Sequence, residues 1–167
     1  MQTFIPYGPD FVASAASLDN SRLGKQRAEN IQIIRALLQP GYGWSNHPAV
    51  QMWSGHEGLL FAYHQAIVNE WTGRGNVDNG TVATFAQTFM QYAPKQANNL
   101  YVPLWLEDER VSESHKASLY RKAPEAYPQF ADAVLTSCHP VPYTRVDGKG
   151  RKVKTKQCDY FWPTHVN

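Results

Sequence analysis

The chain has 167 residues, a formal net charge of +2, 43% hydrophobic residues and 18% charged residues, a composition typical of one globular domain rather than of a disordered or fibrous chain. No stretch approaches the ~18 uninterrupted apolar residues of a membrane span, and the first residues show neither the basic start nor the apolar run of a signal peptide. We therefore expect a soluble cytoplasmic protein in which Cys138 and Cys158 are reduced thiols.

Pro, Gly and Asn divide the first 130 residues into segments of helical length. Asp10 is placed to cap a short helix, and residues 20–38 form a second helix that ends before "QPGYG". A long third helix is expected to start at Pro48 and to end at Gly73 and Gly75. Further helices are predicted within residues 80–93, 106–122 and 124–130.

The C-terminal part carries a basic segment with the alternation of strands. Residues 145–156 hold six Lys or Arg against one Asp, a net charge of +5, so the rest of the chain has a net charge of −3. "YTRV" and "RKVKTKQC", joined by the turn "DGKG", predict a β-hairpin whose cations suit a phosphate backbone. Its expected DNA contacts are Arg151, Lys152, Lys154 and Lys156. We predict an all-α fold, a compact single-domain helical bundle over 1–167 with this basic hairpin inserted at 139–157.

The stretch "SRLGKQRAEN" at residues 21–30 lacks the upstream glycine and the following Ser or Thr of a Walker phosphate loop. On a helix, one face of the stretch carries Arg22, Lys25, Gln26 and Glu29. Arg27 projects to the opposite, apolar face, where a guanidinium requires a partner. Its role is either structural or phosphate-binding, and its candidate partners are Glu57, Glu107, Asp108 and Glu109.

The segment "SNHPAVQMW" adds two candidates, because His47 can either cap a helix or contact DNA, and Trp53 can either fill the core or stack on a base. The core is the favoured place for Trp53. The six His and two Cys show no H-x₃-H, H-E-x-x-H or C-x-x-C spacing. We therefore predict no metal site and no cofactor.

Five segments together resemble the bacterial and phage pyrimidine-dimer DNA glycosylase family of the endonuclease V type. They are "MQTFIPY", "SLDNSRLGKQRAENIQII", "NHPAVQMWSGHE", "PLWLEDERVSESHKASLYRKAPEAYP" and the closing "DYFWP". The resemblance spans nearly the whole chain and is best for the uncharacterised branch of the family. It implies a compact all-α fold that acts on double-stranded DNA.

In characterised members of this family the N-terminal α-amine attacks the sugar C1′, and the resulting Schiff base allows β-elimination with the help of a carboxylate. An α-amine, with a pKa of ~8, is neutral far more often at pH 7 than a lysine. Those enzymes expose a threonine after Met removal, whereas Gln2 is expected to block this processing and to leave Met1 as the nucleophile. Their catalytic glutamate follows an arginine that matches Arg22, but this chain has Leu23 there.

Two carboxylates can replace that glutamate, Glu29 and Asp19, and Glu29 is favoured because it shares the face of Arg22. The favoured function is a monomeric DNA glycosylase with AP-lyase activity on damaged or modified pyrimidines. DNA would be held by Arg22, Lys25, Gln26, Arg27, His47 and the basic hairpin. The alternatives are a catalytically inert DNA-binding protein on the same scaffold and an enzyme that acts on modified pyrimidine nucleotides.

Overall fold

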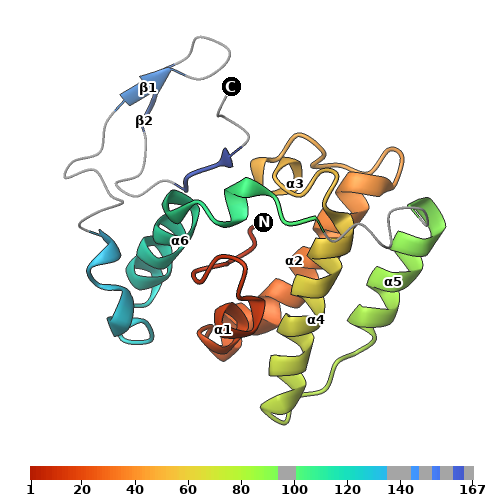
Figure 1. Ribbon diagram of the computed structural model, residues 1–167, viewed down its shortest axis with the longest axis horizontal. Helices are drawn as coiled ribbons and strands as arrows, with labels where there is room; N and C mark the ends of the chain where they lie inside the picture. The colour runs from red at the N-terminus through yellow and green to blue at the C-terminus, as the bar shows by residue number, and fades with distance from the viewer. Residues whose placement is uncertain (94–100, 135–143, 147–151, 155–159, 164–167) are drawn as a thin grey trace. The chain divides into compact units, whose positions relative to one another are not determined.

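The structure is a computed structural model that describes residues 1–93, 101–134, 144–146, 152–154 and 160–163. Its contacts divide the chain into two compact units, Met1–Glu107 with Trp162–Asn167, and Asp108–Phe161. The described residues are predominantly helical, which confirms the predicted fold class at this level (Figure 1). The organisation as a single domain stays a prediction.

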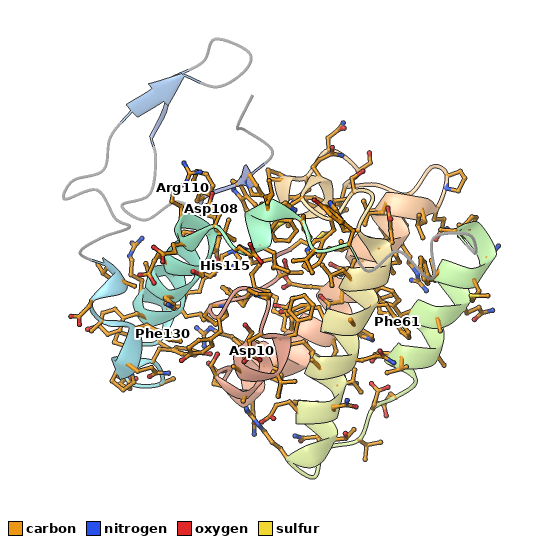
Figure 2. The ribbon with its side chains drawn as sticks, in the orientation of Figure 1. Asp10, Phe61, Asp108, Arg110, His115 and Phe130 are labelled. Atoms are coloured by element: carbon orange, nitrogen blue, oxygen red, sulfur yellow. The ribbon has the colours of Figure 1, made fainter. Side chains whose placement is uncertain are left out.

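The first two helices begin where their capping residues predict. Asp10 caps α1 (Phe11–Ala16) by accepting a hydrogen bond from the Ala13 amide at 2.8 Å (Figure 2). Helix α2 spans Asn20–Leu38, the predicted range, and Asp19 caps it by accepting from the Arg22 amide at 2.8 Å. The caps satisfy amide groups that a helix start otherwise leaves unpaired.

The predicted long third helix is wrong, because the structure divides it into α3 (Pro48–Gln51) and α4 (Glu57–Gly73). Residues 52–55 form turns between them, and Gly55 has a φ of 80°, which is unfavourable for a residue with a side chain. The Glu57 carboxylate accepts a hydrogen bond from the Gly55 amide at 3.0 Å. A glycine at this point therefore allows the chain to turn and α4 to start in a new direction.

The core of the first unit is built around α4, which packs against α1, α2 and α5 (Thr81–Tyr92) (Figure 1). Buried α4 side chains include Leu60, Tyr63 and Ile67, and Phe61 stacks on Phe85 of α5 with ring centroids 5.2 Å apart (Figure 2). Gly24 lets α2 approach α4 closely, since a Cβ there would lie 3.1 Å from the Trp71 ring. The unit also contains the short 3₁₀ helix η2 (Leu104–Leu106).

The second unit contains α6 (Glu109–Lys122), the 3₁₀ helix η3 (Pro128–Phe130) and two short strands. Asp108 caps α6 through the Arg110 amide, and the Arg110 guanidinium pairs with the same carboxylate at 2.6 Å (Figure 2). The hydrogen bonds from Arg110 are the main cause of the lowered pKa of Asp108. Strands β1 (Thr144–Val146) and β2 (Lys152–Lys154) pair antiparallel, with Arg145 opposite Val153.

Within the described ranges, no helix has the length and apolar character needed to cross a membrane.

Candidate active site

The first residues of the chain are held against α2 by the side chain of Gln26. Its amide oxygen accepts a hydrogen bond from the Phe4 N–H at 3.0 Å, and its amide nitrogen donates to the Gln2 carbonyl at 2.5 Å. The same nitrogen lies 3.2 Å from Oδ1 of Asn30. The Gln26 side chain thus replaces the backbone partner that a neighbouring strand would supply.

The predicted contact of Gln26 with DNA stays a prediction, and these hydrogen bonds would compete with it. Gln26 is 1% exposed, and the polar atoms of its side chain are occupied inside the protein. Helical spacing placed it on the polar face, but the N-terminal segment covers this position on the face. Because amide groups without partners are costly when buried, the role of Gln26 is to hold the N-terminal segment.

Two aromatic side chains of the core fix the same segment from the other direction. The Trp53 indole N–H donates to the Thr3 hydroxyl at 3.0 Å, and the Tyr63 hydroxyl donates to the Phe4 carbonyl at 2.9 Å. Both rings are fully buried, so Trp53 belongs to the core, as favoured from the sequence. The backbone of residues 2–4 therefore has partners on both sides.

The N-terminal amine lies beside the carboxylate of Glu29. The Met1 nitrogen is 3.4 Å from Oε1 of Glu29, whose side chain is only 10% exposed. The Lys25 ammonium lies 3.7 Å from the same oxygen, but its side chain is 74% exposed. A carboxylate, an α-amine and an accessible lysine therefore meet at the first residue of the N-terminal segment.

Asp19 has a different place in the structure. Besides capping α2, its carboxylate forms an ion pair with the Arg22 guanidinium, one turn along the same helix. Both oxygens are thereby engaged, Oδ1 with the Arg22 amide and Oδ2 with its guanidinium. Of the two predicted carboxylates, the structure brings Glu29 to the amine and gives Asp19 a capping role.

His47 lies within electrostatic range of the amine. Its Nδ1 accepts a hydrogen bond from the Ala49 N–H at 3.1 Å and caps α3, which was one of its two predicted roles. Partial burial lowers the pKa of His47, the charge of the N-terminal amine lowers it further, and Glu29 opposes them. Near neutral pH the imidazole is therefore neutral, with its proton on Nε2, since Nδ1 is an acceptor.

Arg27 is buried, as its place on the apolar face predicts, but its partner was not among the predicted carboxylates. Its guanidinium donates to Asp78 at 2.7 and 3.1 Å and lies 4.7 Å from the centroid of the Trp71 ring. Burial tends to raise the pKa of Asp78, but hydrogen bonds from Thr81, Val82 and Arg27 outweigh it and the pKa is lowered. This pair favours the structural role of Arg27, and its contact with DNA stays a prediction.

The residues of the basic hairpin are only partly described. Lys152 and Lys154 belong to β2, whereas Arg151 and Lys156 lie outside the described residues, as do Cys138 and Cys158. The proposed contact of this segment with DNA therefore stays a prediction.

A comparison with known families identifies the family of the chain. A family model described as pyrimidine dimer DNA glycosylase matches residues 1–84, half of the chain, and this range includes Met1, Gln26, Glu29 and His47. The chain therefore belongs to the pyrimidine dimer DNA glycosylase family, a family of enzymes that act on DNA. No curated protein and no solved structure matches the chain.

Three residues that contact the predicted site residues were missed from the sequence. Asn30 follows Gln26 by one helical turn, and this spacing could have indicated their contact. Asp78 is separated from Arg27 by 51 positions, so no local pattern connects the two. Trp44 lies in "GYGWSN", where the glycines and the asparagine indicated only a loop.

Proposed function

We propose that the protein is a DNA glycosylase with AP-lyase activity on damaged or modified pyrimidines, with the α-amine of Met1 as nucleophile and Glu29 as the assisting carboxylate. The observation that carries the proposal is the 3.4 Å separation between the Met1 nitrogen and Oε1 of Glu29. Membership in the pyrimidine dimer DNA glycosylase family supports the reaction class.

The proposed reaction starts with the neutral amine. Its nitrogen forms a bond to C1′ of the sugar while the bond from C1′ to the base breaks, and the base leaves with the electron pair and takes up a proton. One amine proton balances the proton taken up by the base, and the other passes to O4′ as the bond from C1′ to O4′ breaks, which opens the sugar ring and gives a Schiff base between Met1 and C1′. Removal of a proton from C2′ then expels the 3′ phosphate, and water releases the sugar from the amine.

Glu29 is placed to take part in the proton transfers of this sequence. Its carboxylate can accept a proton from the amine before attack and can remove the C2′ proton after the Schiff base has formed. Lys25, largely exposed beside Glu29, is suited to hold a backbone phosphate. Arg22 and the basic hairpin are further proposed phosphate contacts.

The proposal is tested by borohydride trapping on duplex DNA that contains a natural abasic site. The protein with a free Met1 amine is expected to form a covalent adduct, and a variant with an N-terminal extension is expected to form none. The same extension at the C-terminus is the matched control. An adduct that persists in the N-terminally extended variant would contradict the assignment of the nucleophile.

The position of the adduct provides a second check, because Lys25 is the nearest competing amine. Arg22 is the first Lys or Arg of the chain, so trypsin separates Met1 and Lys25 into different peptides. We expect the sugar remnant on the peptide 1–22. A remnant on the peptide 23–27 would transfer the role to Lys25, since trypsin does not cleave after a modified lysine. Binding to DNA without an adduct on abasic or dimer-containing duplexes would indicate an inert DNA-binding protein.

A further inference from the structure

Trp44 is an exposed tryptophan held in an unusual backbone conformation. Trp44 is 66% exposed, whereas Trp53 is fully buried. Its φ is 73°, and within the described part of the chain no other residue except glycine has a positive φ. Tryptophan is unfavourable in this region of backbone space, so folding alone does not explain its presence there.

The ring of Trp44 belongs to an aromatic cluster with His47. The two ring centroids are 5.8 Å apart in an edge-to-face arrangement. The backbone N–H of His47 donates to the backbone carbonyl of Trp44 at 2.8 Å. Trp162 contacts His47 edge-to-face as well, with centroids 6.2 Å apart. The contact with His47 and the turn hold one part of Trp44 in place while most of its surface stays accessible.

This cluster lies at the candidate active site. His47 interacts electrostatically with both the Met1 amine and Glu29, and it starts the helix that leads to Met52 and Trp53. Those two residues contact Thr3, two positions from the amine. Trp44 is therefore connected to the N-terminal segment through residues 44–53 of the same unit.

We propose that the exposed face of Trp44 is a stacking surface for a nucleobase of the bound DNA. Attack on C1′ requires access to a sugar that a regular duplex buries, so a base next to the target must leave its stack. An accessible indole provides a replacement stacking partner for such a base whatever its sequence. This proposal rests on the proposed function, because it assumes that DNA is bound for reaction with the Met1 amine.

The test uses duplex DNA with a tetrahydrofuran abasic analogue, which binds but cannot react, and a 2-aminopurine next to or opposite the analogue. Trp44→Gly removes the ring and also relieves the positive φ, so a loss of binding cannot be attributed to added strain. We expect its dissociation constant to rise about tenfold, with brighter 2-aminopurine emission in the complex because no indole quenches it. Trp44→Phe is expected to stay within about threefold of the wild type.

The control variant is Tyr92→Ala, which removes another exposed aromatic ring on α5, away from the N-terminus in Figure 1. It is expected to bind like the wild type. The stacking proposal is overturned if Trp44→Gly binds as tightly as the wild type with unchanged 2-aminopurine emission. A tenfold loss for Trp44→Gly without any borohydride adduct in the wild type would retain the stacking surface and refute the proposed chemistry.

Discussion

The N-terminal segment with α2 and the basic segment 145–156 both carry residues predicted to act on DNA, but they differ in what positions those residues. In the first region, Gln26 and the core side chains hold residues 2–4, and the amine meets Glu29 at 3.4 Å. In the second region the signal is the charge of +5 and the alternation of cations along β2. The first region is suited to a reaction that depends on geometry, and the second to binding that depends on the number of charges.

The largest expected effect separates the two carboxylates of the first region. Glu29→Gln removes the proton acceptor beside the amine and should lower the rate of abasic-site cleavage by about 10²–10⁴-fold. Asp19→Asn is the matched control, since asparagine also caps helices, and its rate should stay within a few-fold of the wild type. Single-turnover cleavage measured by gel makes the comparison. Equal losses of cleavage rate in the two variants would contradict the proposal that Glu29 is the assisting carboxylate.

The ion pair of the buried Arg27 with the partly buried Asp78 should influence stability more than DNA binding. Arg27→Ala removes the charged hydrogen bonds to Asp78 and should lower the free energy of unfolding by about 2 kcal/mol, measured by urea denaturation. The control is Arg110→Ala, which removes a 64% exposed guanidinium from a pair in the second unit and should change stability far less. If Arg27→Ala leaves the stability unchanged and weakens DNA binding, Arg27 contacts a DNA phosphate and the pair with Asp78 does not stabilise the fold.

Gln26 tests whether the first region depends on the geometry of its N-terminal segment. Gln26→Leu removes both hydrogen bonds to residues 2 and 4 and should lower the free energy of unfolding by about 2 kcal/mol. It should also lower the cleavage rate at saturating DNA about tenfold, because the amine is less well positioned. Gln26→Glu retains the acceptor for the Phe4 N–H but turns an oxygen toward the Gln2 carbonyl at a buried position, so we expect a loss of stability at least as large. A normal rate in Gln26→Leu would show that these hydrogen bonds do not position the amine.

The elements that the sequence predicts well are those specified by neighbouring residues. Asp10 and Asp19 mark the starts of α1 and α2, and the apolar face of α2 predicts that Arg27 is buried with a carboxylate. The break before α4 was missed because Gly55 was expected to lie inside one long helix, whereas its φ of 80° makes it a turn residue.

The candidate site was predicted only in part for a similar reason. Glu29 was favoured through its helical spacing from Arg22, and the structure places it beside the amine. Gln26 has the same spacing, but the N-terminal segment covers it, and this is a long-range interaction that periodicity does not contain. The exposure of Trp44 and its packing against His47 likewise depend on a loop conformation.

The smallest expected effect concerns the second region and appears in the salt dependence of binding. Replacing Lys152, Lys154 and Lys156 by Gln removes three charges, and the slope of log K against log salt should become shallower by about 0.9 for each phosphate that is no longer neutralised. Cleavage at saturating DNA should change little, because these residues are expected to supply affinity and not chemistry. Lys25→Gln should change the slope by about 0.9 at most, since it removes a single charge. If the triple variant keeps the wild-type slope, the basic segment does not bind the phosphate backbone, and DNA is held by the first region alone.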